Sequence, residues 1–260
     1  MTVPSREEAA RLLLSLDPPE WHLRHSRAVA EIAGWLALRV ERRARRGPTA
    51  AGRSRDARRP PRDALRGPVG PLRPLEVPEP VDRRLVEAAA LLHDVDKAIR
   101  RRVRGDGPHG EAGARWLAGH GHPELGEAVA LHPVTLLVDR GGAARLRNGS
   151  LEARLVAYAD KRAGQGLEPM ATRFARWRRR HPERRALDSW SPGVARAAWD
   201  RARRLEREVC AIAGCRPEEV GRLRWTTTAL GLARRPLARR GPARRAPGSR
   251  GPESRGKAPS

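Results

Sequence analysis

The chain has 260 residues, with 54 Lys or Arg against 30 Asp or Glu, a formal charge of +24, 39% apolar residues and 3% aromatic residues. This length suffices for one or two domains with a hydrophobic core. No run of about 18 uncharged apolar residues occurs, and the first residues lack the order of a signal peptide. We therefore expect a cytoplasmic protein without a membrane partner. Its two cysteines, Cys210 and Cys215, exclude a disulfide framework and a zinc site built on thiolates.

The positive charge is concentrated in two segments. Residues 42–68 hold ten Arg and two Asp, and residues 233–260 hold nine basic residues and one Glu. Both are rich in Pro, Gly, Arg and Ala and lack apolar periodicity, which predicts a disordered insertion over residues 42–80 and a disordered basic tail over 233–260. Such segments bind nucleic acid weakly by neutralising phosphates. Arg among Ala, Gly and Pro is also the composition of a GC-rich genome, and both explanations stay open.

Outside these segments the sequence predicts an all-α fold. Between Trp21 and Glu41, apolar residues and histidines recur at steps of three or four and form one stripe of an amphipathic helix, with His22 and His25 on the buried side. Residues 81–93 become apolar all round toward their end, as in a helix at the centre of a bundle. His93 and Asp94 follow there, so we expect both side chains to be buried.

The later segments continue the helical pattern. His109 opens a segment whose small residues would let a neighbouring helix approach closely, and His132 ends an apolar stripe that begins after Pro123. Ser150 is a suitable N-cap for a helix that places Asp160 among apolar neighbours. Further helices are expected over 170–180 and 194–213, and strand-like alternation is absent. We therefore predict one helical domain formed by residues 1–41 and 81–215.

Buried carboxylates are costly without a compensating charge. On burial, each of the carboxylates of Asp94 and Asp160 would lose roughly several kcal/mol of hydration free energy unless a cation or hydrogen-bond donors replace the water. Inward-facing histidines supply neutral nitrogen ligands, so a divalent ion would satisfy both groups at once. Each residue taken alone has a simpler explanation, namely a hydrogen-bonded core histidine or a helix-capping aspartate. Their combination favours a metal site.

The order of these residues resembles that of a known superfamily. The strings HSRAVAEIA, LLHDVDK, HGEAGARWL, ALHP and LVAYADK are similar to those of HD-domain metal-dependent phosphohydrolases, and closest to the small bacterial HDIG-type branch. The resemblance covers about residues 20–180 without the insertion. It implies a five-helix core around one or two divalent ions, which could be Mn, Fe, Ni, Co, Mg or Zn. The residues that match the ligand positions are His25, His93, Asp94, His109, His132 and Asp160.

The resemblance also implies how the ligand residues are divided between two ions. His25, His93, Asp94 and Asp160 would hold the first ion, while His109 and His132 would bind a second that Asp94 bridges. Two such ions lower the pKa of a shared water and polarise phosphoryl oxygens, so Asp94 is a catalytic residue as well as a ligand. The implied reaction is hydrolysis of a phosphoester in a nucleotide or a related small phosphorylated substrate.

Two lysines and one aspartate near the motif are open to several interpretations. Lys97 is a candidate catalytic residue that neutralises a substrate phosphate, or else it pairs with Asp94 or Asp96. Asp96, where family members commonly have Gly, would pair with an Arg, add a ligand or repel an anionic substrate. Lys161 points about 100° away from Asp160 on a helix, so we expect it to pair at the surface.

The remaining candidates are mostly assigned to surface or packing. His120, His122 and His181 are expected at the surface, Trp177, Trp190 and Trp199 in packing, and the two cysteines as unpaired thiols that do not face each other. His22 would be a core residue or contact substrate or metal. The alternative function is a nucleic-acid-associated basic protein whose metal site is structural or acts on RNA ends.

Overall fold

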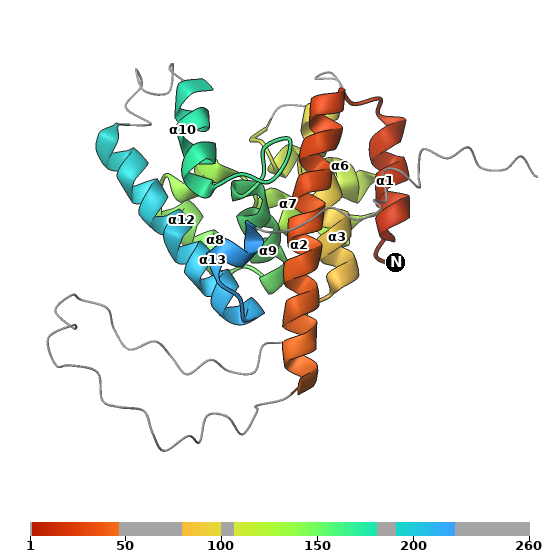
Figure 1. The fold of residues 1–260 in the computed structure, drawn as a ribbon. Coiled ribbons are helices and arrows are strands. Elements are labelled where there is room, and N and C mark those ends of the chain that lie inside the picture. The colour runs from red at the N-terminus through yellow and green to blue at the C-terminus, as the bar shows by residue number, and fades with distance from the viewer. Residues whose placement is uncertain (1, 47–79, 100–106, 181–190, 222–260) are drawn as a thin grey trace, which may run out of the picture.

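The computed structural model describes residues 2–46, 80–99, 107–180 and 191–221. Every regular element in these ranges is a helix, apart from one isolated bridge between Ala163 and Leu167 (Figure 1), so the all-α prediction is confirmed. Most of the predicted insertion and the whole basic tail lie outside the described residues. No helix in the described ranges is both long and apolar enough to cross a membrane.

Helix α2 (Glu20–Arg46) is the longest element of the fold. It packs along α3 (Arg83–Leu92) and α9 (Leu151–Lys161), and α1 (Arg6–Ser15) covers the other side of α3. Figure 1 shows α1 and α3 on one side of α2 and the C-terminal helices on the other. The helix continues to Arg46, past residue 42, where we expected the insertion to begin. Basic residues in its last turn suit the negative end of the helix dipole.

Short helices follow α3 in the chain. They are α4 (Val95–Ala98), α6 (Glu111–Gly119), the 3₁₀ helix η3 (Pro123–Leu125), α7 (Gly126–Ala130), the 3₁₀ helix η4 (Val134–Leu137) and α8 (Arg140–Asn148). Two of them, η3 and α7, pack against α3. Helices α6 and α7 pack closely because Gly113 has no Cβ: an added one would lie 3.2 Å from both Val129 and Val95. The small residues after His109 thus have the role expected from the sequence.

The C-terminal half packs against α9. It contains α10 (Met170–Arg180), α12 (Pro192–Ala213) and α13 (Pro217–Val220). Ser150 caps α9 by accepting a hydrogen bond from the Ala153 amide, which confirms that prediction. Helix α12 contacts both α9 and α2. Helix α9 therefore lies at the centre of the bundle, and all but its first residues and Arg154 are buried.

Several helices were not predicted from the sequence, and α1 and α8 are the longest of them. Helix α1 begins with a capping box in which Ser5 and Glu8 satisfy each other's backbone amides. Helix α8 has the sequence RGGAARLRN, which contains two Gly and a single large apolar residue. Its apolar signal is too weak for a periodicity argument, and it is stabilised instead by Asp139, which accepts a hydrogen bond from the Gly142 amide.

Candidate metal centre

The six residues singled out as ligands come from five places in the chain, because His93 and Asp94 are adjacent, and their side chains form one cluster. Helix α2 carries His25, His93 caps the end of α3, Asp94 precedes α4, His109 precedes α6, His132 follows α7, and Asp160 lies in the last turn of α9. Five are buried, while the side chain of His109 is 34% exposed. This exposure leaves the cluster reachable from solvent on the His109 side.

The four imidazoles form a row in the order His25, His93, His132, His109. Neighbouring ring centroids are 4.9, 4.8 and 4.7 Å apart. The Nε2 atoms of His25 and His93 lie 3.1 Å apart, and those of His132 and His109 lie 3.0 Å apart. The row therefore consists of two pairs, each with its Nε2 atoms facing inward.

The hydrogen bonds of the Nδ1 atoms determine the tautomer of three of these imidazoles. The Nδ1 atoms of His25, His93 and His132 lie 2.7, 2.8 and 2.6 Å from the backbone oxygens of Gly164, Ala90 and Val129. A carbonyl only accepts, so each Nδ1 carries the proton and, in the neutral ring, each Nε2 presents a lone pair. In the pair formed by His25 and His93, two lone pairs thus face each other across about 3 Å, and a cation between them removes the repulsion.

Asp94 turns one carboxylate oxygen toward each histidine pair. Its Oδ2 lies 3.6 Å from Nε2 of both His25 and His93, and its Oδ1 lies 3.1 and 3.3 Å from Nε2 of His109 and His132. Although Asp94 occupies the N-cap position of α4, its side chain makes no capping hydrogen bond, so the capping explanation is wrong. Burial favours the neutral acid, yet His93, Lys97 and the other histidines hold the pKa of Asp94 well below its usual range.

Asp160 lies at the His25 end of the row. Its Oδ1 is 3.2 Å from Nε2 of His25, and Arg173 donates to the same oxygen over 3.3 Å. Burial again favours the neutral acid, but Lys161, His25 and Arg173 hold the pKa of Asp160 well below its usual range. The carboxylate is therefore charged and available as a ligand.

The surface position expected for Lys161 is wrong. Its side chain is only 2% exposed, and its ammonium group donates to Asp160 Oδ2 over 2.9 Å and to the backbone oxygen of His132 over 2.5 Å. A turn of 100° away from Asp160 does not reach solvent, because α9 is buried on almost all sides. Burial lowers the pKa of Lys161, an effect that Asp160 opposes.

These contacts change the argument for a metal. Lys97 donates to Asp94 Oδ2 over 2.7 Å, so both candidate carboxylates already have a cationic partner. Carboxylate charge alone therefore does not require a divalent ion. The facing Nε2 atoms of the imidazoles are the feature of this chain that fits a metal ion best.

Asp96 holds His109 in place. The carboxylate lies 2.9 Å from Nδ1 of His109 and accepts a hydrogen bond from the Gly110 amide over 3.2 Å. Burial lowers the pKa of His109, but the hydrogen bonds that it donates to Asp94 and Asp96 outweigh this effect and raise the pKa to about 9. Of the three roles considered for Asp96, pairing with an Arg is not observed among the described residues. It could also act as a ligand, because Asp94, Asp96 and His109 form one of the groups able to hold an ion.

The other histidines differ from these in their surroundings. His22 is fully buried and stacks on Trp21, but neither of its ring nitrogens has a hydrogen-bond partner, and burial lowers its pKa. His120 is exposed and His122 half-buried, while His181 lies outside the described residues. Trp177 and Trp199 pack against the core as predicted, and Trp190 is not described.

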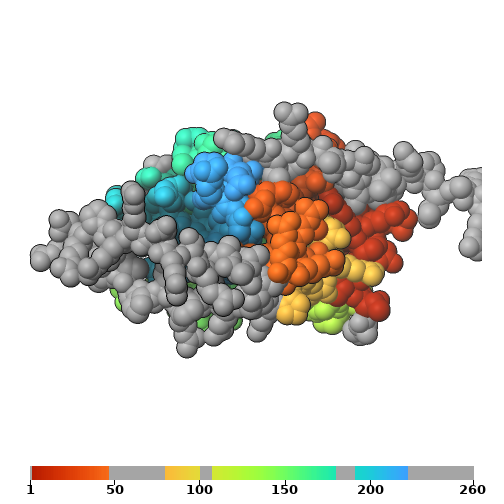
Figure 2. Space-filling model, turned by 60° about the horizontal axis from the view of Figure 1, so that its bottom comes forward, coloured from red at the N-terminus to blue at the C-terminus, as the bar shows by residue number. Residues whose placement is uncertain are grey.

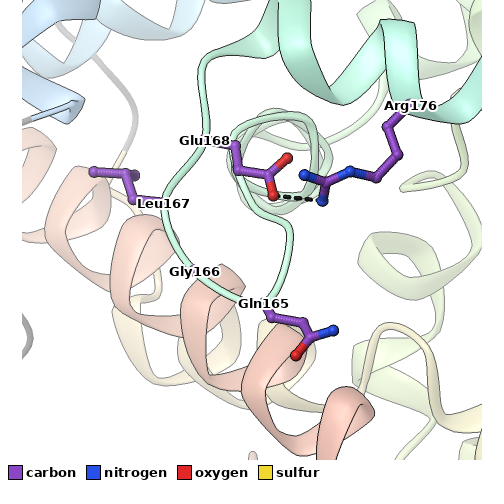
Figure 3. Close-up of a pocket in the computed structure, with 5 residues that line it drawn as sticks. All are labelled: Gln165, Gly166, Leu167, Glu168 and Arg176. Atoms are coloured by element: carbon purple, nitrogen blue, oxygen red, sulfur yellow. Dashed lines mark hydrogen bonds and ion pairs between the residues drawn. The ribbon is translucent and has the colours of Figure 1, made fainter.

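A pocket opens beside the loop that joins α9 to α10. Gln165, Gly166, Leu167, Glu168 and Arg176 line it, and Arg176 pairs with Glu168 (Figure 3). The loop reaches the cluster through Gly164, whose backbone oxygen holds His25. Helix α10 reaches it through Arg173. Sequence reasoning missed Arg173, because only the tertiary fold brings α10 to the end of α9.

Comparison with known proteins agrees with this geometry. The described residues contain three groups able to hold a metal ion: His25 with His93 and Asp160, His93 with Asp94 and His132, and Asp94 with Asp96 and His109. The family model of the HD domain matches residues 23–164, a range that contains all six ligand candidates. No curated protein and no solved structure matches the chain. HD domains are generally metal-dependent hydrolases. The chain belongs to the HD domain family.

Proposed function

We propose that this protein hydrolyses a phosphoester of a nucleotide or a related small phosphorylated substrate in a metal-dependent reaction. The observation that carries the proposal is the pair of facing imidazoles on each side of Asp94, whose Nε2 atoms are 3.1 and 3.0 Å apart. Membership of the HD domain family supports the reaction class. The narrower HDIG-type branch remains a prediction.

The arrangement favours two ions with different ligands. His25, His93 and Asp160 surround one position, His109 and His132 surround the other, and Asp94 offers one oxygen to each. When bound, two divalent ions would lower the pKa of a shared water and polarise the phosphoryl oxygens. The Nδ1 hydrogen bonds fix the ring orientations before any ion arrives, which reduces the cost of forming the site.

Lys97 is the candidate for contact with the substrate. It is 40% exposed, and its ammonium group lies 2.7 Å from Asp94, so it is the charged side chain of α4 that borders both solvent and the cluster. An ammonium in this place neutralises the charge of an incoming phosphate. Lys161 and Arg173 act differently, because both hold the buried carboxylate of Asp160.

The alternative of a nucleic-acid-associated protein rests on the basic segments. These lie mostly outside the described residues, so the described structure adds no support for it. Action on RNA ends would use the same metal centre as action on a free nucleotide.

The test is metal analysis of the purified full chain, followed by assays on p-nitrophenyl esters, mononucleotides, dinucleoside polyphosphates and cyclic nucleotides. We expect one or two divalent ions per chain and hydrolysis of at least one phosphoester class that chelation abolishes. Lys97→Met should lower the hydrolytic activity without loss of the metal, and Lys97→Arg should retain part of the activity. Absence of hydrolysis in a chain loaded with two ions would contradict the proposal.

A further inference from the structure

The two cysteines lie at the C-terminal end of α12, and the helix cap brings them together. Gly214 adopts the left-handed conformation with φ 61° and ψ 44°, and the Cys215 amide donates to the backbone oxygen of Cys210 over 2.9 Å. This six-residue bond defines a Schellman cap, in which the two residues that it joins commonly contact each other through their side chains. The prediction that the thiols do not face each other is therefore wrong, because Cys215 lies beyond the helix and folds back onto it.

The interaction between the two thiols affects their pKa values in opposite directions. Cys215 lowers the pKa of Cys210 despite burial, and Cys210 raises the pKa of Cys215. Cys210 also donates to the hydroxyl of Tyr158 over 3.6 Å, and that hydroxyl donates to Glu206. The thiolate of the pair is therefore favoured at Cys210, although nearby Glu206 raises the pKa of Cys210 and Arg162 lowers it.

Solvent reaches the pair through Cys215. Cys210 is 3% exposed, whereas Cys215 is half-buried, and both are free thiols. Figure 2 shows this end of α12 and α13 packed against the C-terminal half of α2. Arg39 donates to the backbone oxygens of Ala213 and Gly214, and Arg43 donates to that of Ala211, so the cap is held in place from α2. These contacts keep Cys215 folded back toward Cys210.

We propose that Cys210 and Cys215 form a reversible intramolecular disulfide, so that the end of α12 is a redox modification site. With a hydroperoxide as oxidant, the Cys210 thiolate attacks the peroxide oxygen, the O–O bond breaks, and a sulfenic acid and an alcohol or water form. The Cys215 thiol then attacks the Cys210 sulfur, and water leaves with the thiol proton. In sum, two thiols and one hydroperoxide give one disulfide, one alcohol and one water.

The order of the two steps follows from the positions of the sulfurs. The thiolate is favoured at Cys210, and the cap folds Cys215 back onto the same helix end, so we expect the sulfenic acid to be captured before further oxidation. To form the disulfide, the two side chains must rotate until their sulfur atoms lie about 2.0 Å apart. Neither cysteine belongs to the ligand cluster, so the proposal is independent of the proposed function.

The experiment uses the full chain treated with hydrogen peroxide and, in parallel, with oxidised glutathione. Trypsin releases residues 208–222 as one peptide, since the bond after Arg216 precedes a Pro. We expect this peptide to lose two hydrogen atoms, to resist alkylation and to recover both thiols on reduction. Two alkylated thiols after oxidation, disulfide-linked dimers, or a sulfinic acid on Cys210 as the main product would each overturn the proposal.

Comparison of the folded and the unfolded chain, together with matched variants, tests whether the fold itself promotes the disulfide between Cys210 and Cys215. The disulfide should form about tenfold faster in the folded protein than in urea, because the cap holds the sulfurs together. Gly214→Ala should slow the reaction in the folded chain and not in urea, since a Cβ disfavours the left-handed conformation. Cys215→Ser, a change at a half-exposed position, should leave Cys210 open to a sulfenic acid trap. Equal rates in folded and unfolded chains would show that the fold contributes nothing.

Discussion

The ammonium group of Lys161 donates a hydrogen bond to the backbone oxygen of His132 over 2.5 Å. The same group lies 2.9 Å from Asp160. It therefore joins the end of α9 to the residue that follows α7, and so joins a ligand candidate of one proposed ion to a ligand candidate of the other. This single buried cation organises two parts of the centre.

Replacing Lys161 should be costly in the metal-free protein. Lys161→Met leaves the buried Asp160 carboxylate with Arg173 and His25 alone, and loss of one partner from a buried pair typically costs about 3–5 kcal/mol of stability. Urea unfolding in the presence of a chelator measures the change. The matched variant Lys97→Met removes a partly exposed partner of Asp94 and should cost less than about 1 kcal/mol. Similar losses in both variants would contradict this assignment.

The two halves of the histidine row should differ in metal content. His93→Ala removes a ligand candidate that lies between both positions and should abolish nearly all metal binding. His132→Ala should leave about one ion per chain, while hydrolysis falls by orders of magnitude through loss of two-ion activation. Inductively coupled plasma mass spectrometry on both variants, with turnover assays, gives the comparison. Equal metal loss would indicate a single site that includes His132.

Asp96 contributes to the charge of His109. Asp94 and Asp96 together raise the pKa of His109 to about 9, so Asp96→Asn removes one of the two carboxylates and this pKa should fall, while Asp94 preserves part of the increase. An NMR titration of the His109 ring protons in metal-free protein measures it. Metal affinity at the second position should fall by about 10–100-fold, the usual effect of removing an outer partner of a ligating histidine. An unchanged titration would show that Asp94 alone determines the charge.

Buried His22 should make the fold sensitive to acid. Its pKa lies below the unfolded value of 6.5 because burial disfavours the charged form. The unfolded chain therefore binds more protons, and the stability contributed by neutral His22 is present above about pH 6.5 and lost as the pH falls. In His22→Leu the free energy of unfolding should decline less between about pH 7.5 and 5.5. An identical decline in both proteins would assign the acid sensitivity to other groups.

Local sequence patterns were sufficient to predict most of the long helices and the burial of several ligand candidates. Apolar periodicity places His25 and Asp160 on buried faces, and a helix that becomes apolar all round toward its end leads directly to His93 and Asp94. The partners of these residues were not predictable in the same way. Whether Lys161 reaches solvent depends on which helices cover α9, and Arg173 meets Asp160 only through the path of the following loop. The contact between the thiols needed the conformation of Gly214, which residue spacing on a helix does not reveal.

The centre is assembled from residues far apart in the chain. His25 and His93 are separated by 68 residues, and His25 and the oxygen of Gly164 by 139. We expect contacts of such separation to form late in folding, after α2, α3 and α9 have packed together, so that the folding transition state lacks a complete site. A bound ion should then slow unfolding while leaving the refolding rate almost unchanged. Stopped-flow refolding and unfolding with Mn²⁺ and with a chelator would show this as a shift confined to the unfolding limb.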